Sequence, residues 1–243
     1  MADKISKLAL TSCEYCGIGR LCLSNNLLGG DLQELKPVVE RRFPIAKKQR
    51  LFTAQTKQQA IYVVKSGSLK TCEVDIDGDE QILDFYLPGD VLGLEDLSRG
   101  KHCADAIALE DSWLCSVPAP RLSPDSMEGS LIFREMFSVV CHKLARQQEM
   151  IHQLGKAEAT ERLASFLLDL SRRLKDRGLN GGEFRLSMDR ADIASYLRTT
   201  LETVSRAFSN LQRQGCIKVS GKSVRIVELD QLIEHAQKGS LAV

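Results

Sequence analysis

Residues 199–215, TTLETVSRAFSNLQRQG, predict an amphipathic helix. Apolar side chains recur at spacings of three and four residues, at Leu201, Val204, Phe208 and Leu211. The opposite face carries a polar row, which consists of Glu202, Ser205, Arg206 and Ser209. Because Arg206 can present two donors to a guanine edge, this row is typical of a helix that enters a DNA groove. Thr199 with Glu202 predicts a capping box at the start of the helix, and Gly215 predicts its end.

The segments on either side of this helix support the same interpretation. Asp189 is placed to cap a preceding helix, RADIASYL, and a three-residue turn joins the two helices. Two helices joined in this way are typical of a helix-turn-helix, and CIKVSGKSVRIVEL predicts a two-stranded wing around Ser220 and Gly221. Residues 190–225 hold seven lysines or arginines against two acidic residues, which favours phosphate binding. The predicted DNA-binding residues are Arg198, Thr200, Glu202, Ser205, Arg206 and Ser209.

Length and composition place the chain among ordinary globular proteins. Its 243 residues suit two domains, and 43% of them are hydrophobic and 27% charged. No apolar run approaches the length of a membrane span, and the first residues lack the apolar core of a secretory signal. We therefore expect a cytoplasmic protein without a membrane partner. Eight cysteines in that compartment are not expected to form a disulfide framework.

Residues 1–30 form a loop-rich lead-in that contains Cys13, Cys16 and Cys22. Three thiolates within ten residues can converge on one soft metal centre, and Gly17 and Gly19 let backbone amides approach the sulfur atoms. Small segments without a core are usually held by metal or by disulfides. Residues 1–30 are therefore predicted to be a metal-binding segment.

The pattern from about residue 43 to residue 117 predicts short strands separated by turns. Asp77 and Gly78 predict a hairpin between CEVDI and EQILDFYL, and SWLCSVP predicts a later strand. Many short strands at this spacing favour a small antiparallel barrel or jelly roll. We assign residues 31–126 to this sensory domain.

Residues 127–155 predict one long helix with a dimerisation seam. Positions that step by four and three residues form the seam, namely Phe133, Phe137, Val140, Leu144, Gln147, Ile151 and Leu154. This spacing favours a two-chain coiled coil over a helix that packs only on its own domain. Gln147 is the one polar residue in the seam, where it would lower stability and fix the register. Residues 156–243 then form the DNA-binding domain.

The sequence contains no catalytic constellation. Its four histidines, which are His102, His142, His152 and His235, show no metal-ligand spacing, and His142 and His152 are expected at exposed helix positions. No glycine-rich phosphate loop or nucleophile elbow is present. Cys72, Cys141 and Cys216 are expected to be small buried apolar residues. We therefore do not expect an enzyme.

Over essentially its full length the chain resembles the CRP/FNR superfamily of bacterial transcription regulators. LETVSR is similar to the family's E-x-x-S-R recognition signature, and the early cysteines with Cys115 resemble the fumarate and nitrate reduction regulator (FNR) group. The resemblance implies an α+β fold with a cyclic-nucleotide-binding-like β-roll, a long dimerisation helix and a winged helix-turn-helix. It also implies a homodimer that works with RNA polymerase and reads a palindrome similar to TTGAT…ATCAA. The implied cofactor is an oxygen-sensing 4Fe-4S cluster, on Cys13, Cys16, Cys22 and Cys115.

Several alternatives stay open on the sequence. Four thiolates also suit a structural zinc ion, which has no redox chemistry, and nitric oxide or another effector could be the signal. Cys103 competes with Cys115 as fourth ligand, although the family's motif favours Cys115. Binding of cAMP is not expected, because no arginine precedes ADAIAL and Asp105 would repel a phosphate. The chain also departs from the family at Arg198, where glycine is usual, and at Gln147, where the best-known member is acidic.

Overall fold

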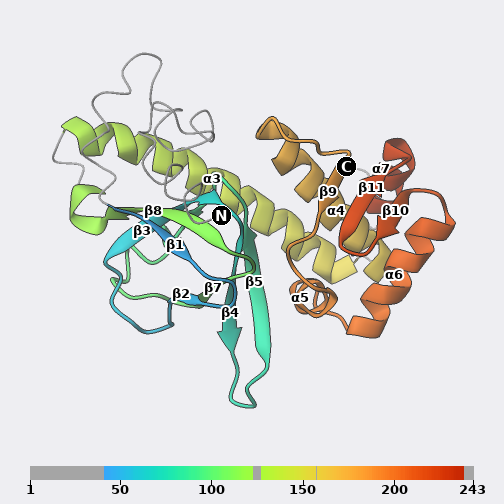
Figure 1. Cartoon of the computed structure of the whole chain (residues 1–243), viewed down its shortest axis with the longest axis horizontal. Coiled ribbons are helices and arrows are strands. Elements are labelled where there is room, and N and C mark those ends of the chain that lie inside the picture. The colour runs from blue at the N-terminus through green and yellow to red at the C-terminus, as the bar shows by residue number, and fades with distance from the viewer. Residues whose placement is uncertain (1–40, 123–126, 157, 238–243) are drawn as a thin grey trace, which may run out of the picture. The chain divides into compact units, whose positions relative to one another are not determined.

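The computed structural model describes residues 41–122, 127–156 and 158–237. The described residues form two compact units (Figure 1). The first consists of residues 41–74 and 83–143, and the second of residues 75–82 and 144–237. The α+β fold class is confirmed.

The first unit contains the predicted roll, which is built from two four-stranded sheets. One sheet has the order β1 (Arg41–Ile45), β8 (Ser112–Pro118), β3 (Ala60–Ser66), β6 (Val91–Leu92), and the other β2 (Arg50–Phe52), β7 (Asp105–Ala108), β4 (Leu69–Val74), β5 (Glu80–Tyr86). The predicted turn between β4 and β5 is confirmed. Gly78 has a positive φ of 88°, which a residue with a side chain adopts only under strain.

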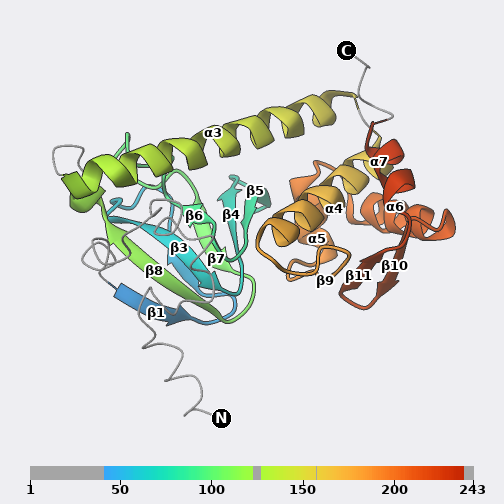
Figure 2. The same cartoon turned by 90° about the horizontal axis from the view of Figure 1, so that it is seen from above.

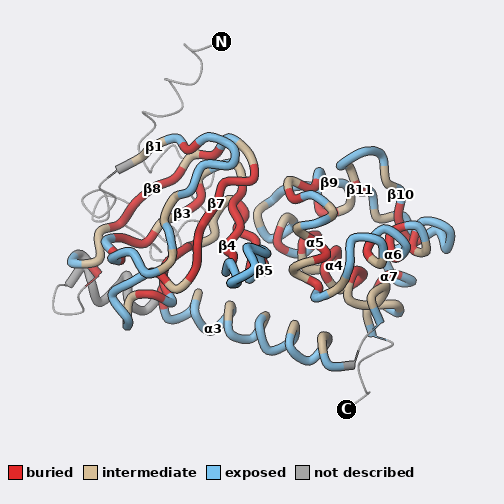
Figure 3. Tube along the Cα trace, turned by 90° about the horizontal axis from the view of Figure 1, so that it is seen from below, coloured by how far each residue is buried: buried red, intermediate tan, exposed pale blue. Residues whose placement is uncertain are grey.

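The core of the roll divides into two groups of apolar side chains. Figure 3 shows the strands largely in the colour of buried residues. One group includes Val64, Leu69, Leu92 and Leu114. The other includes Cys115 of β8 and extends through a short 3-10 helix, Ala119–Leu122, to Met136 of the long helix. Cys115 therefore lies at the junction between a rigid strand and that helix.

The long helix α3 runs from Met127 to Lys156 and is continuous in Figure 2. Met136 is buried against the roll, and Val139 packs on the same apolar group. One turn further on, the Nζ atom of Lys143 lies 2.7 Å from the Tyr86 hydroxyl and 2.9 Å from a Glu95 carboxylate oxygen. These three positions form a stripe that attaches α3 to the roll.

The second unit contains the predicted winged helix-turn-helix. Its elements are α4 (Ala159–Asp176), β9 (Glu183–Arg185), α5 (Arg190–Tyr196), α6 (Leu201–Arg213), β10 (Ile217–Ser220), β11 (Ser223–Ile226) and α7 (Leu229–Gln237). The strands form an antiparallel sheet in the order β10-β11-β9, and β10 and β11 are the wing. The core includes Leu163, Leu167, Ile193 and Leu211, all less than 2% exposed. The sequence analysis did not predict α7.

The start of α6 differs from the prediction. Its cap is Thr200, whose Oγ1 accepts the N–H of Thr203 at 3.2 Å, so the predicted capping box of Thr199 and Glu202 is wrong. The N–H of Thr199 is already committed to the Ala194 carbonyl, because Thr199 belongs to the turn that closes α5. Gly215, with a φ of 79°, follows the end of the helix as predicted.

Two predicted burial assignments are also wrong. Leu201 is 45% exposed, because the first turn of α6 extends beyond the edge of the core. Cys141 is exposed, since it lies on α3 four residues after Phe137, on the face turned away from the roll. Cys72 and Cys216 are buried, as predicted, and His142 and His152 are exposed.

Candidate nucleic-acid interface and metal ligand

The polar row of α6 is exposed along its whole length. Its four members are Glu202, Ser205, Arg206 and Ser209. The hydroxyl of Ser205 donates to the Leu201 carbonyl at 2.8 Å, and that of Ser209 donates to the Ser205 carbonyl at 3.0 Å. Both hydroxyl protons are therefore used in hydrogen bonds within the helix, and the oxygen lone pairs remain at its surface as acceptors. The helix offers an anion, a cation and two neutral acceptors in one row.

Glu202 is held ready to act as an ionised acceptor. A hydrogen bond from its own backbone N–H lowers its pKa, and the Thr200 side chain and the charge of Arg206 lower the pKa further. The carboxylate is fully exposed, so it is accessible to a base amino group that donates a hydrogen bond to it. Thr200 thus caps the helix and also helps to orient Glu202.

Arg198 stands in the turn with a left-handed φ of 53°. Such a backbone costs about 1–2 kcal/mol for a residue other than glycine. The side chain is exposed and lies two residues before the cap of α6. This arrangement suits a contact with the DNA backbone, while the backbone conformation is the one that glycine adopts most easily.

The basic residues of the wing are not equally available. Arg225 forms an ion pair with Glu183 at 2.8 Å across the sheet, and Lys222 donates to the Ser187 carbonyl at 3.1 Å. Lys218 is exposed on β10. The positive charge expected from the composition is therefore partly neutralised in the wing.

The predicted dimerisation seam forms an exposed apolar stripe on α3. The exposed fractions are 64% at Phe137, 43% at Val140, 54% at Leu144 and 69% at Ile151. Gln147 is exposed in the same row, Leu154 is partly exposed, and the side chain of Phe133 lies outside the described residues. Figure 3 shows most of α3 in the colour of exposed residues. Apolar side chains in a row at this exposure are typical of a surface that a partner covers.

Cys115 is the one predicted metal ligand that the structure describes. Its thiol is 6% exposed, is not in a disulfide, and lies among Val63, Val117 and Met136. An unoxidised thiol on a rigid strand fits a soft metal centre. Cys13, Cys16 and Cys22 lie outside the described residues, and among those described no three metal-binding side chains gather.

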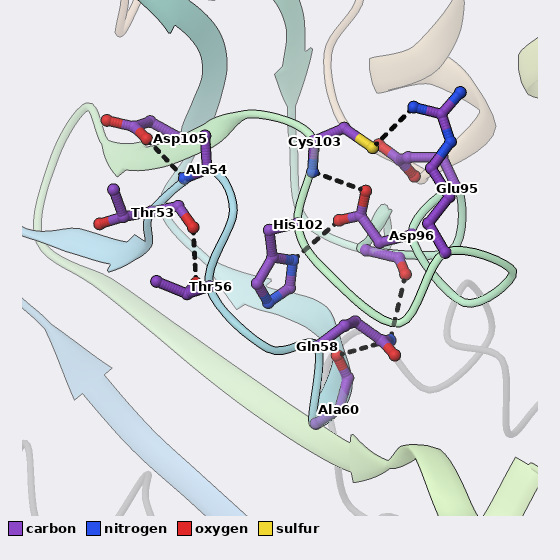
Figure 4. A network of polar contacts seen from close by, with 12 residues as sticks. Thr53, Ala54, Thr56, Gln58, Ala60, Glu95, Asp96, His102, Cys103 and Asp105 are labelled. Carbon is purple, nitrogen blue, oxygen red and sulfur yellow. Dashed lines mark hydrogen bonds and ion pairs between the residues drawn. The ribbon is translucent and has the colours of Figure 1, made fainter.

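Cys103, the rival ligand, lies in a different environment. It is in the loop before β7, and its sulfur accepts a hydrogen bond from Nη1 of Arg99 at 3.3 Å. Its backbone N–H donates to Asp96 at 3.0 Å (Figure 4). Cys103 thus belongs to a polar network rather than to the apolar group that surrounds Cys115.

That network occupies the part of the roll where a cyclic nucleotide would be sought. The buried His102 ring bonds to Asp96 at 2.8 Å and stacks on Phe52 with ring centroids 3.7 Å apart. Buried Asp105 pairs with Arg50 at 3.3 Å and accepts the N–H of Ala54 (Figure 4). These polar groups bind one another, and the absence of cAMP binding stays a prediction.

Comparisons with known proteins identify both units. The Cyclic nucleotide-binding domain model matches residues 42–123, and the Crp-like helix-turn-helix domain model matches residues 161–235. The chain is 38% identical to the Fumarate and nitrate reduction regulatory protein of Escherichia coli K12, over 92% of this chain and 90% of that protein. The chain belongs to the CRP/FNR family of transcription regulators.

Other CRP/FNR relatives agree. The Anaerobic regulatory protein of Pasteurella multocida is 38% identical over 91% of this chain and 81% of that protein. The solved structure of FixK2 from Bradyrhizobium japonicum is 31% identical with a TM-score of 0.74, over 84% of this chain and 98% of that chain. Members of this family regulate transcription and are not enzymes, and the helix-turn-helix is the DNA-binding part. Among the described residues, no helix is long and apolar enough to cross a membrane.

Proposed function

We propose that this CRP/FNR protein regulates transcription in response to oxygen, and that it binds palindromic DNA as a homodimer while it holds a 4Fe-4S cluster. The ligands would be Cys13, Cys16, Cys22 and Cys115. Relatives that are named for anaerobic regulation support the signal. The observation that carries the proposal is the arrangement of two faces on one turn of α3.

Adjacent residues of α3 belong to two different faces, one packed on the roll and the other in the exposed seam. Met136 is buried in the same apolar group as Cys115, and Phe137, the next residue, is 64% exposed in the seam. Consecutive residues of a helix point about 100° apart, so the metal-ligand region and the seam share one helical turn. A change in the packing around Cys115 is thereby passed directly to the surface that would pair.

The chemistry that the cluster supplies when bound is lability toward oxygen. The residues of the chain hold the sulfur ligand, exclude water and attach α3 to the roll. Cys115 keeps a sulfur ligand in an apolar, nearly dry position, and Met136 excludes water from one side of it. Lys143, two turns further along α3, keeps the helix attached to the roll through Tyr86 and Glu95.

Pairing along the seam would place two α6 helices about one DNA turn apart, roughly 34 Å. In each half-site, Arg206 would read guanine and Glu202 an amino group on the opposite strand. Leu201, which the sequence analysis had placed in the core, is exposed. It would add an apolar contact suited to a thymine methyl group. Ser205, Ser209, Arg198 and Thr200 complete the proposed interface.

The anaerobic absorbance spectrum tests the sensor. Protein purified without air is expected to be brown, because iron-sulfur charge-transfer bands absorb visible light, and to lose this absorbance on exposure to oxygen. Iron and acid-labile sulfide are measured on the same sample. A colourless protein with one zinc ion would overturn the oxygen-sensing proposal and would favour a structural metal site instead.

Replacing Gln147 by Asp tests the seam. Two like charges would then face each other in the dimer, at a cost of about 1 kcal/mol and thus roughly a fivefold weaker association. We expect dimerisation of Gln147→Asp to depend more strongly on the bound cluster, as measured by sedimentation with and without air. Gln148→Asp is the matched control, because Gln148 is exposed one residue away from the seam row. An unchanged monomer fraction in air would contradict the seam assignment.

A further inference from the structure

The recognition helix α6 has a contact with α5 that its DNA-facing residues do not use. Arg190, the first residue of α5, lies over the ring of Phe208 in α6, with Cζ 3.2 Å from the ring centroid. Phe208 is 3% exposed, so the ring is fixed in the core. A guanidinium lying over an aromatic face is attracted by the ring's charge distribution, and its flat shape restricts the tilt of the ring.

An arginine at this position carries a cost to stability. Its Nη1 is buried and has no hydrogen-bond partner among the described residues. The side chain is partly buried, and this burial lowers the pKa of Arg190. A buried donor without a partner destabilises a fold, and an apolar side chain of similar length would avoid this cost. The stack on Phe208 offsets part of this cost and fixes the guanidinium against α6.

Two attachments determine the direction of a helix. One end of α6 is attached to α5 through residues 197–200, with Arg198 in its left-handed conformation. The second attachment is the Arg190 stack, about two turns into α6 at Phe208. Phe208 is buried on the inner face and is a helical neighbour of Ser205 in the polar row, three residues away. Loss of the stack would remove one restraint on α6, while Val204 and Leu211 stay buried in the core and Gln212 still accepts the N–H of Val219.

We propose that Arg190 is a positioning residue whose stack on Phe208 sets the angle at which α6 enters the DNA groove. The inference rests on the proposed DNA-reading role of α6 and adds a residue that does not itself touch a base. Base contacts tolerate displacements of only about 0.5 Å, so a small change in helix angle removes specific contacts. Phosphate contacts carry no sequence information and are made by long side chains, so they survive such a change.

The test compares Arg190→Met and Arg190→Lys with the wild-type full-length chain, all prepared without air and matched for iron content. Arg190→Met is expected to keep or raise the thermal midpoint of unfolding. We expect its affinity for a TTGAT…ATCAA duplex to fall about tenfold, while its affinity for random DNA and its salt dependence stay unchanged. Arg190→Lys keeps the positive charge but lacks the flat guanidinium group. Its affinity for the specific duplex is therefore also expected to fall. Arg172→Met is the charge control, because Arg172 is 61% exposed and paired with Asp169 in α4.

Three results would overturn this role. Full specific affinity of Arg190→Met would show that the stack does not position α6. An equal loss on both duplexes, with a shallower salt dependence, would make Arg190 a phosphate contact. A loss of affinity that only follows a lower thermal midpoint would make it an ordinary core residue.

A measurement without DNA separates this inference from the proposed function. Hydrogen exchange of α6 amides is expected to be faster in Arg190→Met, while exchange in α4 stays unchanged, because the stack joins α5 to α6 and does not include α4. Unchanged exchange in α6 would overturn the positioning role even if the wild-type protein binds its palindrome. If the wild-type protein shows no preference for the palindrome, the DNA-reading proposal fails, while the exchange result still decides whether Arg190 restrains α6.

Discussion

Replacing Cys115 by alanine is expected to leave anaerobically purified protein nearly colourless and without specific DNA binding. The substitution removes a thiolate from a position that is 6% exposed and that no solvent molecule can easily replace as a ligand. Changes to groups that only support a metal ligand typically weaken metal binding 10–100-fold, so loss of a ligand itself is expected to cost more than tenfold in iron affinity. Iron content and visible absorbance measure the effect directly.

The same substitution at two other cysteines gives matched controls. Cys72→Ala removes an equally buried thiol from β4, and is expected to keep the colour at some cost in stability. Cys103→Ala removes the rival ligand from the polar network. Iron retained by Cys115→Ala and lost by Cys103→Ala would reverse the assignment of the fourth ligand. Thermal unfolding of the three apoproteins distinguishes loss of the metal from loss of the fold.

Replacing Arg206 by alanine is expected to produce the largest loss of sequence-specific affinity. A bidentate contact between arginine and guanine is worth about 1–3 kcal/mol, and a palindrome contains the contact twice. The expected loss on the specific duplex is therefore roughly 2–6 kcal/mol, while random DNA is bound nearly as well as before. Titrations of both duplexes at two salt concentrations measure the difference.

Arg213→Ala provides the comparison for Arg206. Arg213 is on the same face, two turns after Arg206 in the last turn of α6, and it donates to Asn210 at 2.9 Å. It therefore carries the same charge far from the N-terminal part of the helix, which is the part that reaches base edges. We expect it to weaken binding slightly and by a similar factor on both duplexes. An equal loss on specific and random DNA for Arg206→Ala would show that Arg206 contacts only phosphate, and would remove the central base contact from the proposed interface.

Local signals in the sequence predicted those features whose cause is local. The hairpin at Asp77 and Gly78, the cap at Asp189 and the wing turn at Gly221 all follow from the backbone preferences of a few neighbouring residues. The seam on α3 follows from the repeat of apolar residues along one helix, and its members are exposed or, at Leu154, partly exposed where the structure describes their side chains. Whether they pair stays a prediction.

Features that depend on distant residues could not be predicted in this way. Leu201 fits the apolar periodicity of α6, but the core ends before it reaches that turn. The cap of α6 is Thr200 and not the predicted Thr199, because the N–H of Thr199 donates to the Ala194 carbonyl in the turn after α5. Arg190 and Phe208 are 18 positions apart, and no spacing rule within either helix relates a charged residue on one to an aromatic residue on the other.

The hydroxyl groups of Ser205 and Ser209 have a consequence for discrimination between base pairs. Both protons are committed to backbone carbonyls of α6, so each oxygen presents only electron pairs outward. At the proposed interface these oxygens would repel the O6 and N7 atoms of guanine and the O4 atom of thymine, and would accept hydrogen bonds from the amino groups of adenine and cytosine. The two serines would thus lower the affinity for wrong base pairs, because a wrong base pair brings two acceptors together and leaves both unsatisfied.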